Sequence, residues 1–114
     1  KPRPDSSRRA LASGFWVQAY RRRLEMAMIP CYITARGDDT AGAVLVKVAT
    51  LDGAATAYER RATMEGRQWM VLAQGPEREV DAAIARQRGF DPDLWVIELE
   101  DAQGRTLLDE PGLA

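Results

Sequence analysis

The sequence predicts a single α+β domain in which two helices pack on one face of a mainly antiparallel sheet. Three features support this prediction. Apolar residues recur at helical spacing in two separate segments. Elsewhere, short runs rich in β-branched residues alternate between apolar and polar side chains, as strands do. The chain has 114 residues, of which 46% are hydrophobic and 29% charged, a size and balance typical of one globular domain.

The first helix is predicted over residues 8–28, after a flexible lead-in at residues 1–7. Its apolar residues fall on one broad face: Trp16, Val17, Tyr20, Leu24, Ala27 and Met28. Pro30 ends the helix, because the residue before a proline avoids helical backbone angles.

Four strands are expected next, in an antiparallel meander over residues 31–36, 43–51, 56–62 and 67–74. Asp52 and Gly53 stand between two of these runs and are typical of a hairpin turn. The polar alternation of residues 56–62 indicates a solvent-facing side or a sheet edge.

A second helix is predicted over residues 77–88, with Pro76 at its start. Gly89 follows the last helical arginine and should form a left-handed cap, with Phe90 folding back onto the helix. Strands at 94–100 and 105–110 complete the domain, and residues 111–114 form a tail. In the strand at 94–100, Trp95 should be buried by alternation. The predicted domain therefore spans residues 8–110.

The chain has no histidine and one cysteine, Cys31. A catalytic triad that needs histidine cannot be built, and one thiol cannot complete a zinc site. No disulfide can form within the chain, which favours a reducing, cytoplasmic location. The N-terminal residues do not resemble a secretory signal. No cofactor and no metal are expected.

Charge is distributed unevenly along the chain. Residues 1–36 carry a net charge of +6 and residues 76–114 carry −6. These two parts are expected to meet, within one chain or across a dimer. Arg23 lies near the apolar face of the first helix, so it should be buried and paired with a carboxylate of Asp91, Asp93 or Glu98.

Acidic residues offer two candidate sites for a hard cation or for acid–base chemistry. One is the group at the end of the second helix and in the strand that follows: Asp91, Asp93, Glu98, Glu100 and Asp101. Their spacing alone does not make them converge. The other is the loop "GDDTAG" at 37–42, which lacks the lysine and the following helix of a phosphate-binding loop and is better explained as a turn.

Basic residues offer a third candidate, because arginines near aromatic rings can bind nucleic acid. The group comprises Arg8, Arg9, Arg21, Arg22, Arg23 and Arg36, near Trp16 and Tyr20. The isoelectric point near 5.5 argues against dedicated nucleic-acid binding. The residues selected as candidates for binding a partner are Arg21, Arg22, Arg36, Arg86, Arg88, Asp91 and Asp93.

Three segments stand out together: "FWVQAYRRR", "GDDTAGAVLVKV" followed by "LDG", and "RQRGFDPDLWVIELED". In their order and spacing they resemble a family of small bacterial proteins catalogued as a domain of unknown function, family fourteen ninety-one. The resemblance extends from Phe15 to Glu110. It implies a compact, cytoplasmic, single-domain protein and supplies no catalytic residues, cofactor or partner.

The function expected from the sequence is that of a small non-enzymatic interaction module, either self-associating or bound to another protein. Two alternatives from other classes stay open: an accessory RNA- or DNA-binding protein that uses the N-terminal arginines, and a carboxylate-dependent enzyme with a hard cation. The positions of the arginines, the convergence of the acids and any exposed apolar patch distinguish the three.

Overall fold

Two helices and five strands make up the part of the chain that the computed structural model describes, residues 12–64 and 66–113. In chain order they are α1 (Ser13–Met26), β1 (Cys31–Ala35), β2 (Val44–Ala49), β3 (Ala54–Thr63), β4 (Gly66–Pro76), α2 (Glu77–Phe90) and β5 (Trp95–Glu100). The lead-in at 1–7, together with Arg8 and Arg9, lies outside the described residues.

The five strands form one mixed sheet in the order β1-β5-β2-β3-β4. β5 pairs antiparallel with β1 and parallel with β2, so only β2, β3 and β4 form a meander. The predicted four-strand meander is therefore wrong at β1. The reason lies in β5, whose residues Trp95, Val96 and Ile97 are all buried. A strand that is apolar on both faces is most stable inside a sheet, and β5 accordingly separates β1 from β2.

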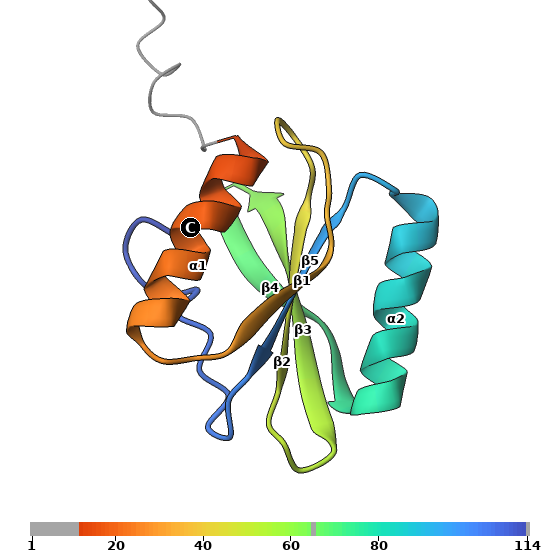
Figure 1. Cartoon of the computed structure of the whole chain (residues 1–114). Coiled ribbons are helices and arrows are strands. Elements are labelled where there is room, and N and C mark those ends of the chain that lie inside the picture. Colours follow the sequence, from red (N-terminus) through yellow and green to blue (C-terminus); the bar gives the residue numbers. More distant parts are fainter. Residues whose placement is uncertain (1–11, 65, 114) are drawn as a thin grey trace, which may run out of the picture.

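The helices cover opposite faces of this sheet, with α1 on one side and α2 on the other (Figure 1). Under α1 lies a core that includes Val44, Val46 and Ile97. Under α2 lies a second core that includes Leu45 and Val96. The prediction that both helices pack on one face is wrong, because β2 and β5 present apolar side chains to both sides of the sheet and each side needs a cover.

The core under α1 is centred on aromatic side chains and is closed by the C-terminal segment. Trp16 and Trp95 are both buried, and the ring of Trp16 stacks on that of Tyr20 with 4.9 Å between centroids. Residues 105–110 form turns and coil, so the strand predicted there is wrong. Leu108, and Leu113 from the predicted tail, are nevertheless buried in this core.

The C-terminal end of α2 also differs from the prediction. Gly89 is helical and does not have a positive φ, and Phe90 is exposed instead of folding back. The helix ends at Phe90, and the next residue, Asp91, has a φ of −136° and donates its backbone N–H to the Gln87 carbonyl oxygen at 2.9 Å. Pro92 explains this end, because it forces the preceding residue into an extended conformation.

The position of β3 corrects a further expectation. Residues 56–62 were expected to have a solvent-facing side or to form a sheet edge, and the second alternative is wrong, because β3 lies between β2 and β4. The edge strands are β1, with 5 residues, and β4, with 11.

Candidate functional site

Lys47 is a buried lysine in the middle of β2, and the sequence analysis missed it. Its neighbours in the strand, Val46 and Val48, point towards α1, so Lys47 points towards α2. Its side chain is 3% exposed. A lysine at this depth requires carboxylates to balance its charge.

Three carboxylates from two elements surround the Lys47 ammonium. Nζ lies 2.7 Å from Glu77 and 2.6 Å from Asp81, both in α2, and 3.6 Å from Glu98 in β5. Burial lowers the pKa of Lys47, but the hydrogen bonds to Asp81 and Glu77 and the charge of Glu98 outweigh it, so the pKa lies above its usual value. Lys47 is therefore a permanent cation, which makes it unsuited to act as a base or a nucleophile.

A small cleft of about 200 Å³ opens beside this cluster, between α2 and the sheet. Its lining includes Thr34, Asp81, Arg88 and Glu98. The Thr34 hydroxyl donates to a Glu98 carboxylate oxygen at 3.2 Å. Lys47 fills the space between the three carboxylates, and the cluster links α2 to β2 and β5.

The other acids of the predicted cluster do not join Glu98. The Arg105 guanidinium lies 2.8 Å from Asp101, and that hydrogen bond lowers the pKa of the Asp101 carboxyl. An Asp91 carboxylate oxygen accepts the backbone N–H of Asp93 within a turn. In residues 12–64 and 66–113, no three acidic or cysteine side chains are placed to hold a metal ion.

The loop at 37–42 connects three parts of the fold through its backbone. The first N–H groups of α1, from Ser13 and Gly14, donate to the carbonyl oxygens of Thr40 and Asp39. The Trp95 indole N–H donates to the Asp38 carbonyl oxygen at 2.8 Å. The loop thus caps α1 and fixes the buried indole, and its carboxylates are not collected around a ligand position.

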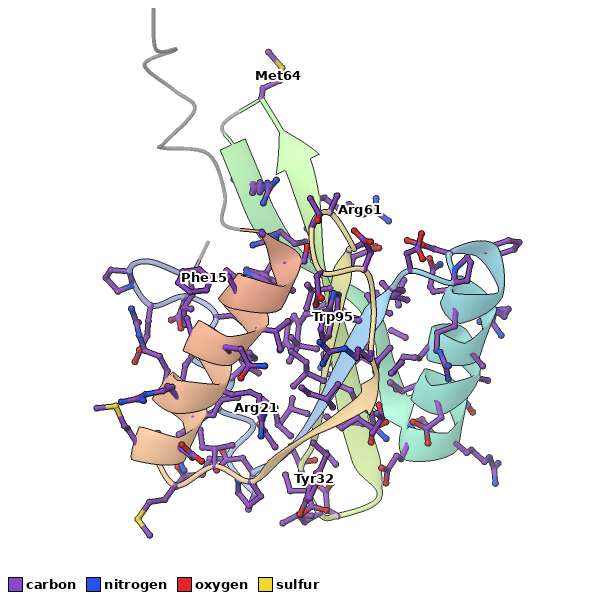
Figure 2. The ribbon with its side chains drawn as sticks, turned by 45° about the horizontal axis from the view of Figure 1, so that its top comes forward. Phe15, Arg21, Tyr32, Arg61, Met64 and Trp95 are labelled. Carbon is purple, nitrogen blue, oxygen red and sulfur yellow. The ribbon has the colours of Figure 1, made fainter. Side chains whose placement is uncertain are left out.

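The predicted basic residues are distributed over separate surfaces. Arg36 lies over the Trp95 ring, 5.1 Å from its centroid, and 3.3 Å from Asp39. Arg21 lies next to Cys31, where burial raises the pKa of the thiol and Arg21 acts against that rise. Figure 2 shows Arg21 and Phe15 on different sides of α1. Arg86 and Arg88 belong to α2, on the opposite face of the sheet.

Arg23 does pair with an acid of the C-terminal third, although not with one of the three predicted. Its guanidinium lies 3.4 Å from Glu110, and both side chains are more than a third exposed. The predicted buried pair with Asp91, Asp93 or Glu98 is wrong, because the segment after β5 returns along α1 and brings Glu110 to Arg23.

A larger cleft of about 720 Å³ separates the C-terminal segment from β3 and β4. Its lining includes Tyr58, Arg67, Trp69, Leu107 and Glu110. The Trp69 indole N–H donates to the Leu113 carbonyl oxygen at 3.2 Å, and its ring lies 5.5 Å from that of Trp16. The cleft therefore has an aromatic wall next to the outer edge of β4, with which no other strand in residues 12–64 and 66–113 pairs.

β4 is a long edge strand with apolar side chains exposed on both faces. Tyr58 packs under α1, and its partner in the ladder is Val71, so Val71 points to the α1 side. Met70 points to the opposite side. The two are 53% and 44% exposed, and Arg67 is the one charged residue of the strand. No signal in the sequence of residues 66–76 distinguishes this edge from an interior strand, because the interior strand β2 also carries a single charged residue.

The family assignment follows from comparison with known proteins. A family model described as a protein of unknown function, DUF1491, matches residues 11–109. The chain belongs to the DUF1491 family. A crystal structure of a DUF1491 protein from Caulobacter crescentus CB15 is 38% identical, with a TM-score of 0.80 over 89% of this chain and 97% of that one. The solution structure of protein Atu0922 from A. tumefaciens has 29% sequence identity to this chain and a TM-score of 0.71. The match covers 90% of this chain and 98% of that one.

Two further findings concern this DUF1491 chain. A search of curated proteins found no match. Neither of the helices described here has the length and apolar character needed to cross a membrane.

Proposed function

We propose that this DUF1491 domain is a protein-interaction module that self-associates by pairing β4 with β4 of a second copy. One observation carries the proposal: an 11-residue edge strand with a single charged side chain exposes Met70 and Val71 on its two faces. Soluble proteins usually protect such an edge with charges, or keep it short, because its free backbone groups can pair with another strand.

The strand is suited to pairing with itself. In an antiparallel pair centred on Met70, that residue lies opposite the partner's Met70, and Val71 lies opposite the partner's Trp69 on the α1 side. Both exposed apolar side chains then gain an apolar neighbour, at the edge of the cleft that Trp69 lines. The bulge in the ladder at Ala57–Tyr58 limits regular pairing to the half of β4 before Ala73.

Electrostatics allow this arrangement. Arg67 stands three residues from Met70, so the two copies of Arg67 would lie on opposite sides of the two-fold axis, about 20 Å apart along the strands. At that distance two exposed charges are largely screened at physiological salt. No like charges face each other across the proposed pair.

The alternatives have less support. Binding of RNA or DNA would be favoured by arginines on one surface, whereas those described lie on both faces of the sheet. A carboxylate enzyme would need acids free to act, whereas Glu77, Asp81 and Asp101 are hydrogen-bonded to Lys47 or Arg105.

The test is the molar mass of the full chain in solution, measured by light scattering over a range of concentrations. We expect a dimer that dissociates on dilution. Met70→Lys should give a monomer, because a charge in the centre of an edge strand opposes pairing. Met26→Lys, which introduces the same charge at an exposed site in α1, should leave the dimer intact.

A cross-link tests the register. In a Cys31→Ser background, Met70→Cys should form a disulfide-linked dimer under mild oxidation, because directly opposed strand residues place their Cβ atoms close to disulfide range. Tyr32→Cys, on the other edge strand, should not. A wild-type monomer at all concentrations, or a dimer unaffected by Met70→Lys, would overturn the proposal.

A further inference from the structure

The outward face of α1 carries an apolar stripe that the core does not use. Phe15, Ala19 and Met26 follow one another at helical spacing, with Arg22 between the last two. Phe15 is 66% exposed and Met26 81%. Figure 2 shows Phe15 projecting from α1 away from the sheet. The buried face of the same helix is a different set, which includes Trp16, Tyr20 and Leu24.

A groove lies between the two large side chains of this stripe. This groove of about 480 Å³ runs along it, lined by Phe15, Gln18, Ala19, Arg22, Arg23 and Met26. The two large side chains stand at its ends, and the small Ala19 forms its floor. Between positions 15 and 26 the helix advances about 16 Å, or three turns. A groove of that length and shape fits a rod-like partner whose side chains enter it at helical spacing.

The charge on this face is positive. Arg22 and Arg23 line the groove, whereas Arg21 lies on another side of α1, and Glu25 is the one acid in the helix. Arg23 is held by Glu110 at 3.4 Å. Within the described part of the chain Arg22 has no such partner, although it lines the groove. A partner that covers the stripe would therefore be favoured if it brought carboxylates to Arg22.

We propose that the outward face of α1 binds an acidic amphipathic helix of another protein. The apolar side of that helix fills the groove between Phe15 and Met26 over Ala19, and its acidic flank pairs with Arg22. A second copy of α1 fits less well, because it would bring its own Arg22 to the same place. A membrane surface fits less well, because it is flat and the apolar stripe is narrow and concave. This surface is separate from the edge of β4.

The probe is a synthetic helix of about 18 residues, with leucines at helical spacing on one side and glutamates on the others. A matched control peptide has lysine at every glutamate position. Backbone amide signals of the ¹⁵N-labelled full chain are followed during titration. The acidic peptide should bind saturably, and the signals that shift should belong to α1. The lysine peptide should not bind.

Variants locate the site. Phe15→Ala and Met26→Ala should each weaken binding of the acidic peptide by about tenfold or more, as expected for anchors of an interface. Arg22→Glu should weaken the acidic peptide and restore some binding of the lysine peptide. All three positions are exposed, so the circular dichroism spectrum should be unchanged. Met70→Lys, at the edge of β4, should bind the acidic peptide like the wild type.

Several outcomes would overturn this inference. One is binding of the two peptides with equal affinity. Another is a set of shifted signals outside α1, or an affinity that Phe15→Ala and Met26→Ala leave unchanged. Tighter binding to anionic lipid vesicles or to duplex DNA than to the acidic peptide would assign the same face to a membrane or a nucleic acid. None of these results depends on whether the chain self-associates.

Discussion

Lys47→Met tests how much the ion cluster between β2, β5 and α2 stabilises the fold. Methionine retains most of the aliphatic length of lysine, so packing between β2 and α2 should be largely preserved. The ammonium is lost. The carboxylates of Glu77, Asp81 and Glu98 then remain next to one another without the cation that lies 2.6–3.6 Å from them.

The expected loss of stability follows from how exposed those carboxylates are. Removing one partner of a buried ion pair costs about 3–5 kcal/mol when the remaining charge stays buried. Here Glu77, Asp81 and Glu98 are 43%, 51% and 34% exposed, so water can solvate them once the lysine is gone. We therefore expect a smaller loss, about 2–3 kcal/mol. At roughly 4 °C per kcal/mol, this is a fall of about 8–12 °C in melting temperature.

The assay is urea unfolding at pH 7, followed by tryptophan fluorescence, with variants of the acids as controls. Glu77→Gln and Asp81→Asn each leave Lys47 with two carboxylates, so each should cost less than about 1 kcal/mol. In the double variant Lys47→Met with Asp81→Asn, the second change should cost nothing further or should restore some stability, because a repelling charge is removed.

One result would refute this reasoning. Lys47→Met could unfold at the same urea concentration as the wild type, or at a higher one. The free-energy cost of desolvating the lysine would then be at least as large as the favourable interaction with its three carboxylates. The cluster would then set the position of α2 on the sheet without stabilising the fold.

Three further predictions concern the glycines, the buried tyrosine and Arg23. Gly89→Ala should stabilise the protein by about 0.5–1 kcal/mol, because the site is helical and open. Gly42→Ala should destabilise it by about 1–3 kcal/mol, because the added methyl meets the Asp93 carbonyl oxygen; thermal melts compare the two. Burial raises the pKa of Tyr20, so its proton stabilises the fold below about pH 10 and that contribution is lost as pH rises further. Tyr20→Phe should therefore flatten the alkaline fall in unfolding free energy, and an equally steep fall would contradict this. Arg23→Ala should cost under about 1 kcal/mol, less in high salt, since the pair is exposed; a larger loss would mean that Arg23 is buried in solution.

Local sequence patterns were sufficient for most of the elements. The helical spacing of Trp16, Tyr20 and Leu24 identified the face of α1 that packs on the sheet. Asp52 and Gly53 marked the hairpin between β2 and β3, where Gly53 has a φ of +94°. These features depend on residues within one or two turns of each other, and a single sequence contains that information.

The order of the strands could not be read in this way. β1 and β2 are consecutive in sequence, yet β5 lies between them and pairs with both. The apolar character of β5 on both faces was visible in Val96 between Trp95 and Ile97, but it was interpreted as a strand with one buried face. Which strand neighbours which depends on pairing between segments far apart in the sequence, as β5 pairs with β1 and β2, and that is a property of the whole fold.

The same limit applies to the candidate sites. Lys47 is the one charged residue in the apolar strand β2. Its presence there was the signal in the sequence that could have indicated a buried ion pair. Its partners come from α2 and β5, at least 30 residues away. Likewise the charge imbalance predicted that basic and acidic ends meet, and Arg23 does reach Glu110, but the choice of partner depended on the path of the C-terminal segment.

The sequence by itself therefore determined the helices, most strands, the absence of histidine chemistry and the family. Tertiary structure decided the order of the strands and the placement of the helices on opposite faces of the sheet. It also decided which carboxylates pair with the Lys47 cation, and that β4 and the outer face of α1 are exposed. The physical reason is the distance along the sequence over which each effect acts. Backbone preference and periodicity act between neighbours in sequence, whereas burial, ion pairing and edge exposure depend on residues that folding alone brings together.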